Sequence, residues 1–458
     1  MMADMEFVRS HEVDAIKARI DHPIIDADGH CVEFVPIVAD ILSEIGGPDM
    51  GKRFRLQSTA HDPSTPAQRR EQGRARHGWW AAPAVNTLDR ATAMLPALLA
   101  KRLPELGLDH AVVYGTLCLG VAHYVEEDYR RATARAFNTY FAESFRDHRD
   151  VITAVGAIPM FTPEEAIDEL EYATGVLGLE AFVFGAPVPR PHPLGGTWID
   201  SLCVDSVHDY DPVWAKCVEL GVAPTFHTQS AGWGSRTSPS SYVFNHIGMF
   251  ATGGEAMARA MFLGGVPHRF PELRCAFQEG GVAWAANLYS DLVGHWEKRN
   301  RDAIGHYDPA RIDKAAMRRL AEEFGGKRVH DHLDDLDEAL RFLSVPEDEL
   351  VDEFAASGVE TKDDIRRLFT ERFYFGCEAD DPLTALAFDS KRLPMGARLQ
   401  PLFASDIGHW DVPDAREVLP EAWECVEKGL ASEEDFRQFT YGNVVELWPF
   451  LADRVPHT

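Results

Sequence analysis

The sequence is short of positive charge. Its 458 residues include 45 Lys and Arg against 73 Asp and Glu, a formal net charge of −28. Nucleic acids and anionic membrane surfaces are bound through basic patches, so this balance argues against both as partners. We therefore expect a small-molecule ligand.

Cysteine pairs and long apolar runs are also missing. The seven cysteines are scattered without a Cys-x-x-Cys pair, which indicates reduced, mostly buried thiols. The longest apolar runs are too short to span a membrane, and the first residues, MMADME, lack the basic-then-apolar pattern of a signal peptide. These absences predict a cytoplasmic location.

Strand-like and helix-like segments alternate along the chain. The length is long for one core but normal for a large α/β barrel with insertions. Eight strands separated by helices predict an α/β fold, a (β/α)8 TIM barrel that occupies residues 1–458 as a single domain. Long helical insertions are expected after strands one and six, at about 31–105 and 300–370. The expected strands are 24–28, 111–116, 151–158, 181–184, 222–227, 273–278, 372–377 and 402–405.

The first expected strand ends in a cluster of polar residues, IIDADGH. Asp26, Asp28 and His30 occupy alternate positions, so the period of a strand turns all three side chains to one face. Gly29 permits close approach of backbone or ligand. This pattern suits half of a metal site. The alternative is an Asp-rich turn with an isolated histidine.

Metal-capable residues follow three other strands as well. His227 comes after strand five, Glu279 after strand six and Asp406 after strand eight. In a barrel these ends meet at the catalytic face, so we expect all of them to join Asp28 and His30 around a divalent ion. The structural alternatives are a core histidine at position 227 and helix caps at positions 279 and 406.

Five segments carry a resemblance to a known family: IIDADGH, NTLDRATAMLP, FHTQS, GGVPHRFPELRCAFQEGG and FASDIGHWD. They resemble amidohydrolase-related proteins of the metal-dependent amidohydrolase superfamily, the group that includes aminocarboxymuconate-semialdehyde decarboxylase-like proteins. The resemblance implies a distorted barrel with one or two divalent ions (Zn, Mn or Fe), and it assigns ligands to Asp28, His30, His227 and Asp406. Strand one has Asp where many relatives have His or Glu, no bridging Lys is evident after strand four, and Glu279 stands where the decarboxylases have His.

The expected chemistry is hydrolysis by a metal-activated water, with Asp406 as the base. The substrate would be an ester, thioester or amide of a bulky apolar or aromatic acid. The alternative is non-oxidative decarboxylation of an aromatic or unsaturated acid. Glu279 favours hydrolysis, because a fixed anion would repel a substrate carboxylate, whereas in a hydrolase it could bind a second ion or carry protons. His246 and His409 are further candidates to line the site. A third possibility is a scaffold protein that has lost the chemistry.

Several aromatic residues fall in the long loops expected on the catalytic face. They could form the wall of an apolar substrate pocket, with Arg236 meeting a substrate anion, or they could bury the insertions against the barrel. Such surfaces also suit a homodimer. The cluster His330-Asp331-His332 is expected to be a solvated helix face, and His268 to be structural. The aromatic residues are Trp79, Trp80, Trp233, Phe244 and Trp410.

Overall fold

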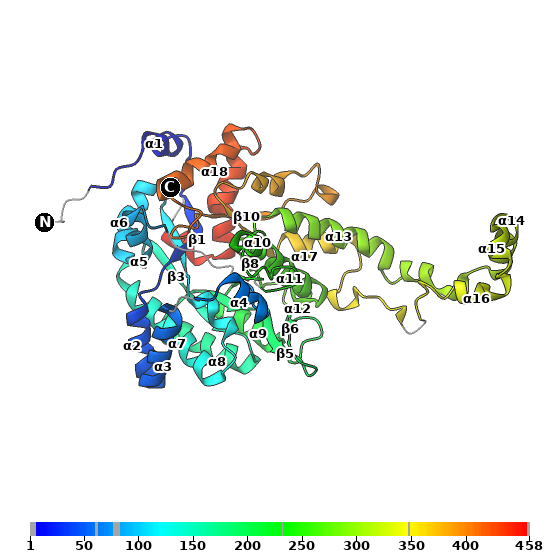
Figure 1. Cartoon of the computed structure of the whole chain (residues 1–458). Coiled ribbons are helices and arrows are strands. Elements are labelled where there is room, and N and C mark those ends of the chain that lie inside the picture. The colour runs from blue at the N-terminus through cyan, green and yellow to red at the C-terminus, as the bar shows by residue number, and fades with distance from the viewer. Residues whose placement is uncertain (1–5, 60–62, 77–82, 231, 347–348, 456–458) are drawn as a thin grey trace.

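Eight parallel strands form a barrel surrounded by helices, as predicted (Figure 1). The structure is a computed structural model that describes residues 6–59, 63–76, 83–230, 232–346 and 349–455. Neighbouring strands pair in the order β1-β2-β3-β4-β7-β8-β9-β10. Their bounds are β1 Ile25–Cys31, β2 His110–Gly115, β3 Ile152–Pro159, β4 Ala181–Gly185, β7 Pro224–Phe226, β8 Cys275–Phe277, β9 Phe373–Glu378 and β10 Gln400–Ala404.

β2 and β3 form where β-branched and other apolar residues predominate. All residues of β2 (HAVVYG) and β3 (ITAVGAIP) are buried, as expected for a parallel sheet covered by helices on its outer face and filled by side chains inside. Phe226, Phe277 and Phe375 stack across three neighbouring strands, with ring centroids 5.5 and 6.0 Å apart. This aromatic packing lies at the ends of β7 and β8 that carry His227 and Glu279.

Helices follow most of the strands and pack on the outside of the barrel. The clearest start is that of α8, where Thr162 accepts a hydrogen bond from the backbone N–H of Glu165 and Pro163 opens the first turn. These helices are α7 Glu127–Ser144, α8 Pro163–Gly175, α9 Asp211–Leu220, α11 Met249–Leu263, α13 Ala283–Arg299, α17 Lys362–Thr370 and α18 Val418–Glu427. The shorter helices are α1 His11–Lys17, α10 Tyr242–His246, α12 Val266–Arg269, α19 Glu433–Arg437, α20 Asn443–Leu447 and α21 Phe450–Arg454.

Two long helical segments interrupt the alternation. Between β1 and β2 lie α2 Val35–Gly46, α3 Pro48–Thr59, α4 Pro66–Glu71, α5 Thr87–Met94 and α6 Pro96–Leu106. Between β8 and β9, after α13, lie α14 Lys314–Phe324, α15 Gly326–His330 and α16 Leu336–Ala339. Figure 1 shows that the second group projects far from the barrel. We refer to residues 309–344 as the arm. His330, Asp331 and His332 lie exposed on it, as predicted.

One element was not predicted. The proline-rich segment after β4 contains an antiparallel hairpin of β5 Val188–Pro191 and β6 Thr197–Asp200. Its residues are too rich in proline to show strand periodicity, and the hairpin stands apart from the barrel as a separate two-stranded sheet.

A seam between β1 and β10 completes the barrel. Asp26 accepts hydrogen bonds from the Ser405 N–H at 3.0 Å and from the Ser405 hydroxyl at 2.6 Å. The Asp406 N–H donates to the Asp28 carbonyl at 3.1 Å, and the His30 N–H donates to the Ile407 carbonyl at 3.2 Å. These bonds hold the first and last barrel strands together directly beneath the candidate site.

The seam corrects one expectation about the first strand. A register shift lies between Asp26 and Gly29 where β1 pairs with β2. Strict alternation is therefore interrupted, and the Asp26 side chain bonds Ser405 while Asp28 and His30 face other polar residues. Close packing at Gly29 is as expected, because a Cβ there would lie 2.5 Å from Asp26 Oδ2.

The cysteines are free thiols, as their scattered positions in the sequence indicate. Five of the seven cysteines are buried and two are half-buried, and all seven are free thiols. Within the described residues, no helix combines the length and the apolar character needed to cross a bilayer.

Candidate metal centre

Polar side chains from four strand ends converge at the mouth of the barrel. Asp28 and His30 come from β1, while His227, Glu279 and Asp406 lie just beyond β7, β8 and β10. All five are at most 5% exposed. Parallel strands bring their carboxyl ends to one face of a barrel, which is why residues far apart in sequence meet here.

One group of neighbours contains Asp28, His30 and His227. The two Nε2 atoms of the histidines lie 3.3 Å apart. Asp28 Oδ1 lies 3.6 Å from His30 Nε2, and Asp28 Oδ2 lies 3.8 Å from His227 Nε2. Ligand atoms from all three side chains lie within 4.8 Å of one another.

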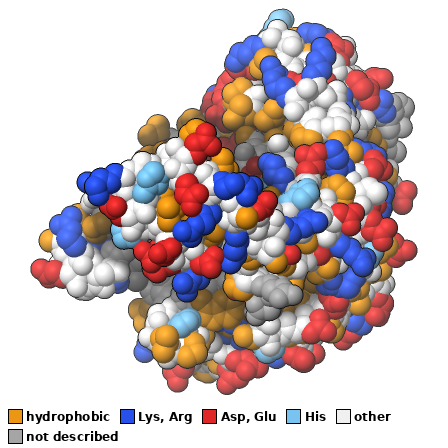
Figure 2. All heavy atoms as spheres, turned by 90° about the vertical axis from the view of Figure 1, so that its right-hand side faces the viewer, with side chains coloured by type: hydrophobic (Ala, Val, Ile, Leu, Met, Phe, Trp, Pro, Cys, Tyr) orange, Lys and Arg blue, Asp and Glu red, His pale blue; other side chains and the backbone are white. Residues whose placement is uncertain are grey.

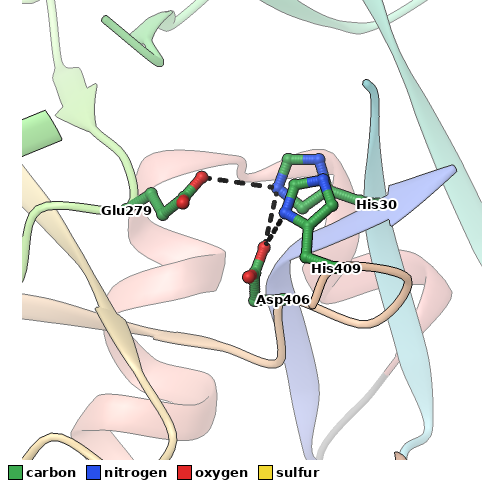
Figure 3. A group of neighbouring side chains, drawn as sticks. All are labelled: His30, Glu279, Asp406 and His409. Carbon is green, nitrogen blue, oxygen red and sulfur yellow. Dashed lines mark ion pairs between the residues drawn. The ribbon is translucent and has the colours of Figure 1, made fainter. Parts of the chain in front are cut away.

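A second group shares His30 and adds Glu279, Asp406 and His409 (Figure 3). Asp406 Oδ1 lies 3.2 Å from His30 Nε2 and 2.6 Å from His409 Nδ1. Glu279 Oε2 lies 4.0 Å from His30 Nε2 and 2.9 Å from His227 Nε2. Glu279 thereby links the two groups.

These residues fit a divalent ion. Two ligands about 2.1 Å from one ion, at tetrahedral or octahedral angles, lie about 3.0–3.4 Å apart. The separations between imidazole and carboxylate atoms fall around that range, from 2.9 to 4.0 Å. Glu279 Oε1 is buried and has no hydrogen-bond partner within the described parts of the chain. Imidazole and carboxylate donors suit Zn, Mn or Fe.

Burial dominates the electrostatics of the site. It raises the pKa of Asp28, Glu279 and Asp406 well above the usual range, and neighbouring carboxylates raise each of them further. Burial also lowers the pKa of His227 to about 3 and that of His30 well below its usual range. Neutral imidazoles are ready to act as ligands, and bound cations would replace protons on the carboxyl groups.

The backbone is strained at two of these positions. Glu279 has a φ of 53° and Asp406 has a φ of 50°, a left-handed backbone conformation that residues other than glycine rarely adopt. Such strain persists where the surrounding structure enforces it, and it is concentrated at functional sites. Here it turns both carboxylates from the end of a strand toward the cluster.

Two neighbours support the histidines. The His409 ring stacks on His30 with centroids 3.8 Å apart, and His409 Nε2 lies 3.2 Å from the Thr116 hydroxyl. The Tyr114 ring lies 5.8 Å from that of His227, and its hydroxyl donates to Thr225. His409, predicted to line the site, therefore lies within the cluster itself.

An aromatic wall continues outward from His227. The Phe250 ring meets His227 edge-on at 5.0 Å, and His246 lies 6.0 Å beyond it. Tyr242 stacks on His246 at 5.2 Å, and Trp410 contacts both of them at 5.9 and 5.8 Å. His246 also lines a cavity of about 210 Å³ together with Glu279. His246 therefore borders the cavity beside the cluster, and Trp410 packs against His246.

Arg236, Phe244 and Trp233 are not among the described residues that line this cavity. Arg236 donates a hydrogen bond to the Ile247 carbonyl and so fixes its own loop. Phe244 is 57% exposed on the outer side of α10, and Trp233 borders a separate cavity of about 420 Å³ with Trp198. Trp79 and Trp80 lie outside the described residues.

Sequence reasoning missed Glu378 and Asp411. Glu378 ends β9 and lines the same 210 Å³ cavity as Glu279. Burial, followed by the charge of Asp411, raises its pKa to about 8. The strand-end rule could have found Glu378, but strand seven was expected to stop at Cys377, one residue earlier. Asp411 follows His409 in a loop that carries no periodic signal.

Several solved structures share the fold. An amidohydrolase from Mycobacterium avium subsp. paratuberculosis K-10 is 16% identical with a TM-score of 0.54, and the match covers 93% of this chain and 99% of that one. A 2,6-dihydroxybenzoate decarboxylase from Rhizobium is 13% identical with a TM-score of 0.54, covering 94% and 99%. A 5-carboxyvanillate decarboxylase from Novosphingobium aromaticivorans, solved with bound manganese, is 13% identical with a TM-score of 0.51, covering 97% and 100%.

Comparison by sequence gives one match, to a family model. No curated protein matches this chain. The family model described as amidohydrolase matches residues 25–330, which hold Asp28, His30, His227 and Glu279. Because this match extends over more than half of the sequence, the chain belongs to the amidohydrolase family.

Proposed function

We propose that this protein is a metal-dependent decarboxylase of an aromatic carboxylic acid. The observation that carries the proposal is the buried ligand cluster beside an aromatic wall, on a fold that it shares with decarboxylases of two aromatic acids. The wall of Phe250, His246, Tyr242 and Trp410 suits a flat ring, and the cluster suits the carboxylate attached to it.

The residues divide the work between binding and proton transfer. Asp28, His30, His227 and Glu279 would hold one divalent ion or two, together with Asp406. When bound, such an ion supplies positive charge that holds the substrate carboxylate and stabilises charge developing next to it. The wall orients the ring and excludes water from it.

Asp406 and His409 are suited to move the proton. Asp406 Oδ1 lies 2.6 Å from His409 Nδ1, so a proton can pass between the two side chains. In its protonated form Asp406 can donate a proton to the ring carbon that bears the carboxylate. The bond to the carboxylate then breaks, its electron pair restores the aromatic ring, and carbon dioxide leaves.

The position of Glu279 weakens the main objection to decarboxylation. A free anion facing the substrate would repel its carboxylate. Glu279 Oε2 instead lies 2.9 Å from His227 Nε2, inside the ligand cluster. The charge of Glu279 would therefore be neutralised by the cation. It would repel a substrate carboxylate less than its residue type alone suggests.

Hydrolysis of an ester, thioester or amide is the second candidate, and Glu378 favours it. This carboxyl group lines the same cavity as Glu279, and burial raises its pKa to about 8. Such a group can take a proton from an attacking water and pass it to a leaving group near neutral pH.

Isotopic labelling separates the two candidates. The protein would be loaded with Mn²⁺ and incubated in ¹⁸O-labelled D₂O with hydroxybenzoic acids and with aryl esters, thioesters and amides. Decarboxylation releases carbon dioxide and places one deuteron on the ring, whereas hydrolysis places ¹⁸O in the released acid. Labelled acid without carbon dioxide would overturn the proposal in favour of hydrolysis. A protein that binds no metal and turns over no compound would support the scaffold reading.

A further inference from the structure

The cavity beside the ligand cluster is lined by acidic side chains. Among the described residues that border its volume of about 210 Å³, Glu279, Glu378 and Asp381 carry carboxyl groups, and none is Lys or Arg. Arg236 lies behind Gly248, but its Nη2 donates to a backbone carbonyl of its own loop. On the face of the molecule in Figure 2, by contrast, Asp and Glu side chains are intermingled with Lys and Arg. The lining of the cavity lacks this balance of charge.

The three carboxyl groups differ in what they already bind. Glu279 Oε2 lies 2.9 Å from His227 Nε2, while its buried Oε1 has no hydrogen-bond partner among the described residues. Asp381 Oδ1 accepts from the Leu383 N–H at 2.9 Å and so caps the turn that follows it. The Glu378 side chain forms neither an ion pair nor a hydrogen bond with any residue that the structure describes. Glu378 is therefore available to a ligand.

A fourth carboxyl group, that of Asp411, lies close to Glu378. After burial, the charge of Asp411 does most to raise the pKa of Glu378, and the same is true of the pKa of Tyr242. Asp411 Oδ1 and the Tyr242 hydroxyl are both buried without a hydrogen-bond partner in the described parts of the chain. Two carboxyl groups that bind no cation of the protein thus lie near one another at this side of the site.

Aromatic rings stand beside these carboxyl groups. Phe250 and His246 border the cavity, and the rings of Tyr242 and Trp410 meet each other at 5.9 Å while both contact His246. The faces of aromatic rings attract cations, and aromatic cages are a recurring means of binding ammonium groups. Hard metal ions prefer oxygen ligands and gain nothing from such rings. The combination of carboxylates and rings therefore favours an organic cation.

We propose that the aromatic acid carries a protonated amino group, which Glu378 and Asp411 bind at this side of the cavity. The inference rests on the proposed function, in which the ligand cluster holds the carboxylate of the same molecule. Glu378 and Asp411 then determine specificity. A neutral substituent gains no charge pairing with them, and a second carboxylate on the ring is repelled.

Binding to the Mn²⁺-loaded protein tests the inference. Calorimetric titration would compare salicylic acids that carry an aminomethyl, a hydroxymethyl or a carboxyl group at the same ring position. The aminomethyl acid should bind about tenfold or more tightly than the hydroxymethyl acid, and the dicarboxylic acid should bind most weakly. Glu378→Gln combined with Asp411→Asn should remove this preference without loss of metal. Asp380→Asn is the matched control, because this exposed carboxyl follows β9 but does not line the cavity, and the variant should keep the preference.

The outcomes separate this inference from the proposed function. If the acids bind with affinities that do not depend on the charge of the substituent, or if the double variant keeps the preference, the inference is wrong and the decarboxylase proposal stands. Glu378→Lys should reverse the preference toward the dicarboxylic acid. If no acid binds, the decarboxylase proposal fails, and benzylamine then tests the cavity alone. Saturation-transfer NMR should detect benzylamine and not benzyl alcohol on the protein, and equal signals would overturn the inference.

Discussion

At the scale of single residues, burial favours the neutral form of both the carboxyl groups and the histidines of the site. Asp28, Glu279 and Asp406 have raised pKa values and His30 and His227 have lowered ones, chiefly because all are buried. Without a cation, protons on the carboxyl groups lower the free-energy cost of burying charge in the cluster. Cation binding should therefore release protons and become tighter as pH rises.

Replacing Asp406 by Asn should abolish most activity without unfolding the protein. The amide fills the same space beside His409 but cannot carry the proton, so kcat should fall by about 10²-fold or more. Steady-state kinetics, with circular dichroism to verify the fold, make the measurement. Asp453→Asn, at an exposed carboxyl, serves as the control. Unchanged turnover would remove Asp406 from the proton path.

Replacing Glu279 by Gln should lower the affinity for Mn²⁺ by about 10- to 100-fold. Glu279 Oε2 lies 2.9 Å from His227 Nε2, a candidate ligand, and Gln keeps the length of the side chain but loses its charge. Calorimetric titration and metal analysis measure the change. If metal content stays the same while the rate falls, Glu279 acts as a proton carrier and is not a ligand.

A histidine far from the mouth should make stability depend on pH. Burial, with a smaller effect from the charge of Arg454, lowers the pKa of His110 to about 4, while an unfolded histidine titrates near 6.5. The unfolded chain binds the proton first as pH falls, so the contribution to stability is complete above 6.5 and is lost toward pH 4. His110→Gln should remove this loss. The stability advantage of wild type over the variant, from urea unfolding of the metal-free proteins, should shrink by up to about 3 kcal/mol between pH 7.5 and 4.5. A constant difference would contradict the assignment.

At the scale of elements, the seam between β1 and β10 determines the geometry of the site. Asp26 is not in the ligand cluster, yet it bonds both the backbone and the hydroxyl of Ser405, which precedes Asp406. It also accepts from the Asp28 N–H at 3.2 Å. The Asp26 side chain thus helps to position the candidate ligands Asp28 and Asp406 on both sides of the seam.

Removing that side chain should loosen both strands. Asp26→Ala leaves the buried Ser405 N–H without its partner, which should cost about 1–3 kcal/mol of unfolding free energy. Mn²⁺ affinity should fall as well, because Asp28 and Asp406 lose their alignment. Denaturant unfolding and calorimetry measure the two effects. Asp26→Asn should restore much of both, and normal metal binding by Asp26→Ala would rule out a positioning role.

Strand ends were the most predictable part of the molecule. Asp28, His30, His227, Glu279 and Asp406 were found because side chains after parallel strands must meet at one face of a barrel. The different direction of Asp26 was not predictable, since it depends on an irregular register that only the pairing with β2 reveals. Glu378 escaped because strand boundaries are uncertain by a residue or more.

At the scale of the whole molecule, cation binding should stabilise the fold. A ligand that binds only the folded state adds about 2.7 kcal/mol at one hundred times its Kd. Mn²⁺ should therefore raise Tm by several degrees and chelation should lower it, with a larger shift at pH 8 than at pH 6. Differential scanning fluorimetry measures this. The double variant His30→Ala with His227→Ala should show no shift, and a Tm indifferent to Mn²⁺ in the wild type would argue against the site.

The alternation of strand-like and helix-like segments predicted the fold class, but it did not predict that the arm projects from the barrel. The stretch from about 300 to 370 was expected to be a charged helical insertion, and charge alone cannot show whether such a segment folds onto the barrel. Only the structure reveals that Leu320 and Phe324 face solvent and that the arm stands apart.

The seam also determines when the site can come into existence. Asp26 and Ser405 are 379 positions apart, so the ligands on β1 are made long before Asp406 and His409. On the ribosome, the cluster stays incomplete until β10 has emerged, because Asp406 and His409 follow that strand. An ion bound between Asp28 and Asp406 would oppose the separation of the first and last barrel strands, which should slow unfolding more than it speeds folding.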